Sequence, residues 1–421
     1  MNIRIFPPEE ILETTVSRLP LSKSVSARVL VLGALTPGAE TPAADLLADC
    51  DDIRVLSRAI LSRQGEVTVH ESGTALRFLT AFFAATPGAD VTLTGVHRLC
   101  QRPIEPLIKA LRSLGADIEY ADKEGRAPLH IRGRKLTGGE VNLDASSSSQ
   151  FASALAMVGP TMEKGLKIHL GGQIPSMPYL KMTLTMMQNR GIDAHTEGYS
   201  VIVPAGTYLP VQPESEPDWT AASYWYEIDA VTAGWVTIPR LKAQSLQGDS
   251  ILQNIGERFG VVTNYDDAGA ELSATPDLYS RLDMNMADNP DLVPALAVTG
   301  CLVGIPYEFT GVANLRLKES DRLQALADEL AKIGCIAEIG NDTFSWEGRR
   351  EPILRNPEID PHGDHRIAMA FAAASYFLPG IILLNSEVVE KSYPGFFDDL
   401  RDAGFTILDA DAPMPEPTHD E

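Results

Sequence analysis

The sequence predicts an α/β fold with internal helices, built from six copies of a unit of about 70 residues. Helices rich in Ala and Leu recur along the chain, and each is followed by a Gly or Pro turn and a short apolar strand. These helices are apolar on nearly all sides, which is typical of helices buried inside a domain. A second helix, with its apolar residues on one face, follows each of them and leads to another strand.

Four of the units are clear in the sequence and two are weaker. In the clear units, the buried helix and its strand are expected at Gly73–Gly95, Ser149–Gly171, Pro290–Gly311 and Asp364–Asn385. The second helix and strand are expected at Arg102–Tyr120, Pro178–Thr196, Ser320–Ile339 and Tyr393–Leu408. The weaker units are Ser22–Gly38 with Asp51–Gly65, and Ala221–Pro239 with Asp249–Tyr265.

A Pro-rich, acidic stretch, Pro210–Pro217, separates the first three units from the last three. Such a composition is typical of a linker or crossover. The sequence therefore predicts two domains, one of residues 20–215 and one of residues 1–19 with 216–421, and a cleft between them. The segment before Leu21, which contains Ile3 and Val16, is predicted to form a strand that pairs with the second domain.

The composition excludes several classes of protein. Hydrophobic residues make up 44% of the chain and charged residues 22%, which indicates a globular protein. The net charge of −22 argues against nucleic acid as a partner, but a locally basic cleft could still bind small anions. The four cysteines form no CxxC pair, so neither a disulfide framework nor a structural zinc site is expected.

No membrane association is predicted. The segment Ile367–Leu384 is almost wholly apolar, but Pro379-Gly380 interrupts it, so we expect a buried helix, a turn and a buried strand there. The start of the chain lacks the basic and then apolar regions of a signal peptide. We therefore expect a cytoplasmic protein.

Several predicted helices begin with groups that can bind anions. The stretch Pro20–Arg28 places serines, a lysine and an arginine at the start of an apolar helix, and a serine run ending at Ser149 begins another. Backbone amides and hydroxyls at a helix start suit a phosphate. Further helix starts carry Gly73, Arg102 or Lys391. Each motif alone could be an ordinary cap, but their recurrence predicts a cleft that binds more than one anion.

Two charged motifs of the second half allow different interpretations. Lys318 and Glu319 could exchange protons, because adjacent opposite charges tune each other's pKa, or the motif could simply cap a helix. The segment Asp360–Arg366 contains two His, but no further cluster completes a set of metal ligands. We expect no metal there, with Asp364 as a helix cap and Arg366 as an anion-binding side chain.

In combination, these motifs resemble the 5-enolpyruvylshikimate-3-phosphate (EPSP) synthase family, in order from about Leu19 to Phe397. Pro20–Ser24, Glu71–Arg77 and Asn314–Arg322 resemble its PGSKS, NAGTAMR and NxRxKE(S/T)DR motifs. Arg102–Ile104, Ser148–Phe151 and Gly363–Arg366 match its RPI, SSQF and GDHR motifs. The departures are Leu21 for Gly, Glu71 and Ser72 for Asn-Ala, and Phe78 for Pro. The resemblance assigns no role to the Tyr- and Trp-rich stretch 219–235.

The resemblance implies a fold and a reaction. The family has a two-domain inside-out α/β barrel, each domain with three copies of a βαβαββ unit, and the two domains close over the substrates. It transfers the enolpyruvyl group of phosphoenolpyruvate to the 5-hydroxyl of shikimate 3-phosphate through a tetrahedral intermediate, on the shikimate pathway to chorismate and aromatic amino acids. No metal or organic cofactor takes part. A monomer is expected, open when free, with glyphosate taking the phosphoenolpyruvate place.

The resemblance also implies a role for individual residues. Asp291 would act on the 5-hydroxyl, Glu319 would exchange a proton with the methylene carbon, and Lys23 would touch both substrates. Asp291 could instead be a helix cap. Shikimate 3-phosphate is expected to contact Lys23, Ser24, Arg28, Ser148, Ser149, Gln150, Ser176, Tyr179, Asp291, Asn314 and Lys318. Phosphoenolpyruvate is expected to contact Lys23, Gly73, Arg102, Gln150, Arg322, Arg366 and Lys391.

Two alternatives remain beside this prediction. The UDP-N-acetylglucosamine enolpyruvyl transferase family has the same fold and the same enol donor. Cys100, close before Arg102, superficially matches the active-site Cys of that family, which lacks the SSQF, KESDR and GDHR set. A non-enzymatic acidic scaffold protein is the other alternative, but it would not need so many basic helix starts.

Overall fold

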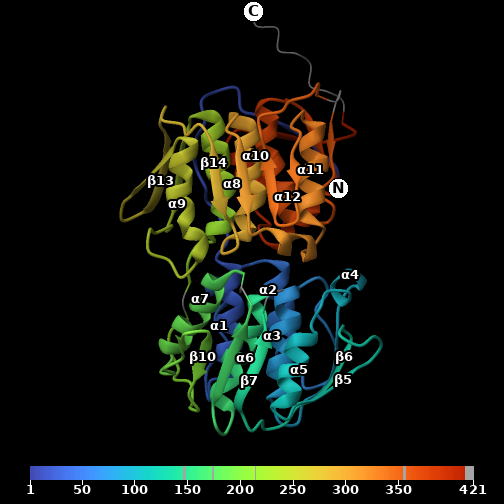
Figure 1. Ribbon diagram of the computed structural model, residues 1–421. Coiled ribbons are helices and arrows are strands. Elements are labelled where there is room, and N and C mark those ends of the chain that lie inside the picture. Colours follow the sequence, from blue (N-terminus) through green and yellow to red (C-terminus); the bar gives the residue numbers. More distant parts are fainter. Residues whose placement is uncertain (146–147, 173–174, 214, 354–356, 413–421) are drawn as a thin grey trace, which may run out of the picture.

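The computed structural model describes residues 1–145, 148–172, 175–213, 215–353 and 357–412. The chain forms two halves, one above the other in Figure 1, and each half has its own hydrophobic core. The core of the lower half extends from Leu21 to Tyr208. The core of the upper half combines residues between Ile3 and Leu19 with residues between Trp219 and Phe405. Sheets and buried helices occur in both halves, so the predicted α/β class is confirmed.

The described strands form five four-stranded mixed sheets, and all five repeat one pattern. The first two strands of a unit are parallel, and the remaining neighbours are antiparallel. A parallel pair needs a crossover connection, and the buried helix of each unit provides it. In four of the sheets, the last two strands form a hairpin whose second strand lies inside the sheet, so the spatial order is first, second, fourth, third. In the fifth sheet, the amino-terminal strand β1 (Ile3–Phe6) takes this inner place.

The lower half contains two of these sheets. The first sheet consists of β3 (Gln64–Thr68), β4 (Asp90–Thr94), β6 (Leu129–Arg132) and β5 (Asp117–Tyr120), with α3 (Gly73–Ala84), α4 (His97–Cys100) and α5 (Glu105–Ser113). The second consists of β7 (Gly139–Asp144), β8 (Leu166–Gly171), β10 (Ser200–Val203) and β9 (His195–Glu197), with α6 (Ser149–Val158), η2 (Gly159–Thr161) and α7 (Met177–Gln188).

The first unit departs from the predicted repeat. Its two helices are present, as α1 (Lys23–Leu35) and α2 (Asp51–Ala59). Residues 36–63 are all described. Apart from α2, they contain the short 3-10 helix η1 (Ala44–Leu46), and they form no strand. This connection has three residues, Pro37, Gly38 and Pro42, that weaken a sheet ladder. The strand predicted to end at Gly65 is β3, which pairs with β4 and therefore belongs to the next unit.

The upper half contains three sheets. One has β2 (Glu13–Thr15), β11 (Trp235–Pro239), β13 (Gly269–Ala274) and β12 (Val261–Tyr265), with α8 (Trp219–Thr232), η3 (Gly248–Ile251), α9 (Leu252–Gly256) and η4 (Glu257–Phe259). The next has β14 (Leu282–Asn285), β15 (Tyr307–Thr310), β17 (Thr343–Trp346) and β16 (Glu338–Ile339), with η5 (Pro290–Leu292), α10 (Val293–Val303), η6 (Ala313–Leu317) and α11 (Arg322–Lys332). The last has β18 (Glu358–Ile359), β19 (Ile381–Leu383), β1 (Ile3–Phe6) and β20 (Thr406–Asp409), with α12 (His365–Ala370), η7 (Phe371–Tyr376), η8 (Ser386–Lys391) and α13 (Phe396–Asp402).

The amino-terminal segment belongs to the upper half, as predicted, and it forms two strands in two different sheets. β1 lies between β19 and β20 and is antiparallel to both. β2 is parallel to β11 and takes the first place in its sheet. The chain then crosses to the lower half and returns about 200 residues later, so that the amino terminus lies beside the last strands in Figure 1.

The two crossings between the halves lie side by side. Leu21 pairs with Pro217 in an isolated antiparallel bridge. The Ser22 amide donates to the Glu216 carbonyl at 2.8 Å, and the Asp218 amide donates to the Pro20 carbonyl at 2.9 Å. The end of the predicted linker is therefore tied to the start of the lower half.

The buried helices are apolar on all sides, as the sequence predicts. Every residue of α3 except Thr74 is buried, and every residue of α10 except Val303. The Tyr- and Trp-rich stretch is α8, which is also an internal helix. Two of its polar ring atoms have partners: Trp225 Nε1 donates to Tyr393 Oη at 3.2 Å, and Tyr226 Oη lies 2.7 Å from the Thr263 hydroxyl.

The apolar segment Ile367–Leu384 forms buried helix, turn and strand, as predicted. α12 continues directly into η7, and the turn at Pro379-Gly380 leads into β19. Within the described part of the chain, no helix is long and apolar enough to cross a membrane.

Candidate active site

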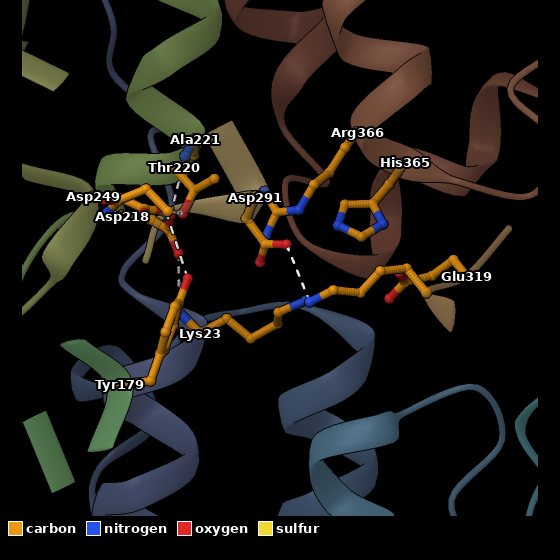
Figure 2. A network of polar contacts seen from close by, with 12 residues as sticks. Lys23, Tyr179, Asp218, Thr220, Ala221, Asp249, Asp291, Glu319, His365 and Arg366 are labelled. Atoms are coloured by element: carbon orange, nitrogen blue, oxygen red, sulfur yellow. Dashed lines mark hydrogen bonds and ion pairs between the residues drawn. The ribbon is translucent and has the colours of Figure 1, made fainter. Parts of the chain in front are cut away.

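The candidate site is a cavity between the two halves, where helix starts from both halves meet (Figure 2). Its volume is about 110 Å³. Among the described residues, seven Lys and Arg and four carboxylates line it, in a chain whose net charge is −22. The cations are Lys23, Arg28, Arg77, Arg102, Lys318, Arg322 and Arg366, and the carboxylates are Asp52, Asp218, Asp291 and Glu319. The surplus of positive charge makes the cavity a site for anions.

The start of α1 contributes Lys23. Ser22 caps this helix, as expected, by accepting a hydrogen bond from the Val25 amide. The Lys23 amide donates to Asp218 of the upper half at 3.2 Å, and its Nζ lies 3.1 Å from an Asp52 oxygen. Burial lowers the pKa of Lys23, but the neighbouring acidic groups, with Asp52 as the strongest, together outweigh this effect and leave the pKa above its ordinary value. Lys23 is therefore a firmly charged cation at the junction of the halves.

Arg28 lies further along α1 and is buried. Its guanidinium donates to the Thr183 hydroxyl at 2.7 Å, to the Ser24 carbonyl at 2.7 Å and to the Tyr179 carbonyl at 2.9 Å. Burial lowers the pKa of Arg28 to about 10, so the side chain stays charged at neutral pH. These bonds fix Arg28 between α1 and α7 at the cavity.

Helices α3 and α6 also begin at the cavity. Ser72 and Ser148 cap them through their hydroxyl oxygens. Gln150 Nε2 donates to the Thr74 hydroxyl at 2.9 Å and so joins the two helix starts. Residues 146 and 147 of the predicted serine run lie outside the described residues.

Two arginines lie against Gly73. A Cβ atom at this position would lie 2.8 Å from Arg77 Nη1 and 2.9 Å from Arg102 Nη1. The missing side chain therefore lets both guanidinium groups approach the helix start. Arg77 donates to the Gly73 carbonyl at 2.8 Å, whereas the buried Nε of Arg102 has no hydrogen-bond partner among the described residues. A ligand group in the cavity could satisfy this donor.

Asp291 is surrounded by cations of the upper half. Its carboxylate oxygens lie 3.1 Å from Arg322 Nη1, 2.8 Å from Arg366 Nη2 and 3.6 Å from Lys318 Nζ. Burial raises the pKa of Asp291, but these cations outweigh burial and hold the pKa well below its ordinary value. Asp291 lies within η5 and its carboxylate caps no helix of the described structure, so the capping alternative is not supported.

Glu319 is the second buried acid of the cavity. Its carboxylate lies 2.9 Å from Arg322 Nη2 and 3.6 Å from Lys391 Nζ. Burial raises the pKa of Glu319, but Lys391, Arg322 and Arg102 outweigh it and hold the pKa well below its ordinary value. Lys391 also lies 3.5 Å from Glu71 of the lower half, one of the positions that depart from the family motif.

The start of α12 forms an ion pair with Arg322 of the site. Asp364 caps the helix and accepts hydrogen bonds from Arg322 at 2.8 and 3.2 Å through its two oxygens. His365 is buried at the cavity, whereas His362 lies 2.9 Å from Glu329. The described residues contain no group of three or more His, Cys, Asp or Glu that could hold a metal ion.

The structure brings nearly all residues of the predicted site to one cavity. These are Lys23, Ser24, Arg28, Gly73, Arg102, Ser148, Ser149, Gln150, Ser176, Tyr179, Asp291, Asn314, Lys318, Glu319, Arg322 and Arg366. Lys391 is the exception, because it lines an adjoining cavity of about 210 Å³ that shares Arg102 and Glu319 with the first.

The sequence analysis missed several polar residues of the cavity. Arg77 and His365 lie inside motifs that it used, so their place in these motifs was an available signal. Asp52, Asp218 and Thr220 have no distinct signal, because acids and hydroxyls at helix starts are ordinary. Only the tertiary structure brings both acids to Lys23.

The fold and the site together define a class of protein: an α/β protein with a cationic cavity between two halves, in which ionised carboxylates lie among Lys and Arg. Such a cavity suits the binding of small anions and proton transfer to them. Residues 57–400 match the sequence profile of EPSP synthase (3-phosphoshikimate 1-carboxyvinyltransferase). The chain belongs to the EPSP synthase family.

Relatives cover nearly the whole chain. A protein of Bacteroides fragilis named 3-phosphoshikimate 1-carboxyvinyltransferase is 42% identical over 410 residues, which are 97% of this chain and 99% of the relative. A protein of the same name from Syntrophobacter fumaroxidans is 36% identical over 405 residues, 90% of this chain and 95% of the relative. The resemblance seen in the motifs is thereby confirmed, and the comparisons favour it over the UDP-N-acetylglucosamine alternative.

Solved structures agree on the fold. EPSP synthase from Acinetobacter baumannii aligns with a TM-score of 0.75 at 23% identity, over 97% of this chain and 99% of that one. The enolpyruvyl transferase NikO from Streptomyces tendae aligns with a TM-score of 0.73 at 15% identity, over 98% and 99%. At these identities, the likeness establishes the α/β fold with its mixed sheets.

Proposed function

We propose that the chain transfers the enolpyruvyl group of phosphoenolpyruvate to the 5-hydroxyl of shikimate 3-phosphate and releases phosphate. The observation that carries this proposal is the meeting of Lys23, Asp291 and Glu319 on one cavity with a surplus of cations. Both substrates carry a phosphate and a carboxylate, which Lys and Arg bind through charge-assisted hydrogen bonds. Membership of the EPSP synthase family and the names of the relatives support the same reaction.

We further propose that the two halves are domains, of residues 20–215 and of residues 1–19 with 216–421. Each would be an inside-out α/β barrel, with its helices inside and its sheets outside. The two separate cores support this division, and so do the internal helices. Three units have the βαβαββ order along the chain, and the amino-terminal strands β1 and β2 complete it in two more. Because the first unit keeps only helices, the lower barrel would close with two sheets and the upper one with three.

Shikimate 3-phosphate would occupy the part of the cavity at the starts of α1, α6 and α7. Arg28 offers a fixed guanidinium there, and the hydroxyls and amides at the start of α6 suit an anionic group. The residues proposed to contact it are Lys23, Ser24, Arg28, Ser148, Ser149, Gln150, Ser176, Tyr179, Asp291, Asn314 and Lys318.

Phosphoenolpyruvate would occupy the part beside Gly73, where Arg102 has an unsatisfied donor. The residues proposed to contact it are Lys23, Gly73, Arg102, Gln150, Arg322, Arg366 and Lys391. Lys391 would reach the donor from the adjoining cavity, through the shared wall of Arg102 and Glu319.

Asp291 would accept the proton of the 5-hydroxyl while that oxygen forms a bond to C2 of phosphoenolpyruvate. The surrounding cations keep Asp291 ionised, which a base requires. The same cations also make it a weak base in the free protein. Substrate anions that bind Lys318 and Arg366 would compete for these cations and so strengthen Asp291 as a base.

Glu319 would give a proton to the methylene carbon C3 in the addition step. In the elimination step, C3 loses a proton to Glu319 as the bond between C2 and the phosphate oxygen breaks, and phosphate leaves beside Lys23. In the free protein, Lys391, Arg322 and Arg102 hold the pKa of Glu319 low. The donor's phosphate and carboxylate would bind these same cations and raise the pKa, so donor binding would prepare the acid that the addition needs.

We propose that the protein works as a cytoplasmic monomer on these two small molecules, with no nucleic acid or membrane partner. The side chains of the cavity can supply the proton transfers and the charge stabilisation of the reaction, so the proposal requires neither a metal nor an organic cofactor.

The test is phosphate release by the purified protein. Phosphate should be released when phosphoenolpyruvate and shikimate 3-phosphate are both present, and not with either alone. Release with UDP-N-acetylglucosamine as the acceptor would overturn the proposal in favour of the related transferase. Release from phosphoenolpyruvate with no acceptor would point to a phosphatase, and no release under any of these conditions would point to the non-enzymatic scaffold.

A further inference from the structure

A buried carboxyl outside the proposed reaction, Asp249, lies where the two halves meet (Figure 2). Only 2% of this residue is exposed. Its Oδ2 accepts hydrogen bonds from the Thr220 hydroxyl at 2.5 Å and from Tyr179 Oη at 3.5 Å, and its Oδ1 accepts one from Asn289 Nδ2 at 3.0 Å. Burial raises its pKa to about 6, although its hydrogen bonds and the charge of Arg366 act in the opposite direction. Three hydrogen bonds offset the cost of burying this group.

These hydrogen bonds join both halves. Tyr179 lies in the first turn of α7, in the lower half, whereas Asp249 belongs to η3 of the upper half. In Figure 2, the ring of Tyr179 points from the lower half toward Asp249 and Thr220. Asn289 directly precedes η5, which carries Asp291. The Asp249 carboxyl thus contacts both Tyr179, which is proposed to bind the acceptor substrate, and Asn289, which lies two residues before the proposed base Asp291.

Close packing holds the same junction. A Cβ atom at Gly248 would lie 2.2 Å from the Pro178 Cβ, so η3 and the start of α7 are in direct contact with no space for a side chain. The start of α7 is also tied to the loop before η5. The Ser176 amide donates to the Ala287 carbonyl at 2.7 Å, and the Met177 amide donates to Asp288 at 3.2 Å.

We propose that Asp249 is a positioning residue that docks the start of α7 onto the upper half. By this docking it holds Tyr179 and Asp291 at the separation that the acceptor substrate requires. The docking itself is independent of the reaction, but its effect on the acceptor rests on the proposed function. Asp249 acts through Tyr179 and Asn289 and lies outside the cavity lining.

The docking is tested first on the free protein, by hydrogen–deuterium exchange. Asp249→Asn keeps the size of the side chain but removes its charge, and a hydrogen bond to a charged group is worth roughly a tenfold change in an equilibrium or more. The amides of Ser176 and Met177 should therefore exchange about tenfold faster or more. The matched control is Asp229→Asn, another buried carboxyl of the upper half that lies off the cavity. Unchanged exchange at these amides would overturn the docking.

The effect on the acceptor is tested by calorimetric titration with shikimate 3-phosphate and by steady-state kinetics. In Asp249→Asn, the dissociation constant for shikimate 3-phosphate should rise about tenfold, while KM for phosphoenolpyruvate changes little. Tyr179→Phe should cause a similar loss, and the double variant should lose no more than either single one, because both act through one contact. Additive losses, or an equal loss for both substrates, would refute the positioning role.

A second variant covers the case in which Asp249→Asn does not fold. Gly248→Ala leaves the Asp249 carboxyl in place but pushes Pro178 away, so it should reproduce the faster exchange and the weaker acceptor binding. Normal behaviour of Gly248→Ala would contradict the docking. If the unaltered protein binds no shikimate 3-phosphate, the proposed function fails, and the exchange measurement still decides the docking.

Discussion

Asp291 and Glu319 are buried acids that remain ionised because Lys and Arg surround them. For each, burial raises the pKa, and the neighbouring cations lower it by more. The cations are the groups that we expect to bind the substrates. The two carboxylates and the substrate anions therefore compete for the same positive charges, and proton affinity in the site should change on binding.

Replacing Lys23 or Glu319 by Ala should abolish turnover while the fold stays intact. Both side chains are proposed to lie at the reacting atoms, where loss of a proton-transfer group costs roughly 10²- to 10⁴-fold in rate. Phosphate release measures the effect, with circular dichroism to check folding. Lys242→Ala, at an exposed lysine away from the cavity, is the matched control and should keep full activity. Near-normal turnover in a folded variant would remove that residue from the mechanism.

Gly73→Ala should weaken glyphosate more than phosphoenolpyruvate. The new Cβ would lie under 3 Å from a guanidinium nitrogen of both Arg77 and Arg102, so these ends must shift into the donor's place. Overpacking of this kind costs about 1–3 kcal/mol, and glyphosate, whose chain is longer, has less space to adapt. We expect the inhibition constant to rise about tenfold and KM for phosphoenolpyruvate to rise less. Equal losses for both ligands would show that Gly73 lies elsewhere in the donor site.

The site could be predicted from the sequence only where a residue lies in a local motif. Lys23, Glu319 and Arg366 each occur in a short run of characteristic residues, and the structure brings them to one cavity. Asp52 and Asp249 could not be predicted, because what distinguishes them is contact with residues distant in the sequence. An acid next to a helix start is common, and its burial is a property of the tertiary structure.

Helix α8 contains two buried acids whose effect on the free energy of unfolding depends on pH. The carboxyl oxygens of Glu227 and Asp229 have no hydrogen-bond partner among the described residues. Burial raises the pKa of Glu227 well above its ordinary value and that of Asp229 to about 7. Both groups therefore favour the neutral form in the folded protein.

Asp229→Asn should flatten the pH dependence of stability between about pH 4 and 7. The folded pKa of Asp229 is about 7 and its ordinary value is 3.8, so its neutral form is favoured on folding. This contribution is fully present below about pH 4 and is lost as the pH rises through 7, a change on the order of 4 kcal/mol in the free energy of unfolding. Urea unfolding at pH 5, 6, 7 and 8 measures it.

The control for this experiment is Asp193→Asn, at an exposed carboxylate of the lower half. It should leave the pH dependence as it is in the unaltered protein. At pH 8, the Asp229→Asn variant should be more stable than the unaltered protein, because burial of an uncharged amide is less unfavourable in free energy than burial of a carboxylate. A pH dependence that the substitution leaves unchanged would show that Asp229 has a partner in solution.

Most helices and strands could be predicted, because the apolar periodicity differs between buried and half-buried helices. α3 and α10 are apolar on all sides, whereas α5 and α11 have one apolar face, and all four lie where the pattern places them. The prediction was wrong for the strands of the first unit. The connection after α1 contains Pro and Gly and forms no strand among residues 36–63. The fold does not need a strand from this connection, because the sheet of the next unit already has its four strands.

At the scale of the whole molecule, the cavity is small for its proposed ligands. Its volume is about 110 Å³, whereas sites for small organic ligands usually have about 300–1,000 Å³. Ion pairs between its own side chains occupy much of the space, as between Asp291 and Arg366. Some contacts also cross between the halves, such as Glu71 with Lys391. The halves must therefore move apart at the side of Glu71 and Lys391 to admit two substrates, while the junction at Asp249, which lies beside the crossings between the halves, stays docked.

We predict that the protein in solution is more open when free than when both substrates are bound. The cations on the two faces repel each other, and although four carboxylates temper this repulsion, the surplus charge favours separation until substrate anions neutralise it. Small-angle X-ray scattering should show a smaller radius of gyration with shikimate 3-phosphate and glyphosate than without them. The matched comparison is phosphate at the same ionic strength, and an unchanged radius would refute closure.

The two amino-terminal strands have a consequence for the order in which the molecule is made. β1 leaves the ribosome before the other described strands, yet its partner β20 begins at Thr406, about 400 residues later. At synthesis rates of about 5–20 residues per second, β1 waits on the order of 20–80 seconds for its neighbours. The lower half, by contrast, lies in one continuous stretch and can fold during this time. The nascent chain must therefore keep an apolar strand unpaired through most of its synthesis, which makes this segment the place where a chaperone would be needed most.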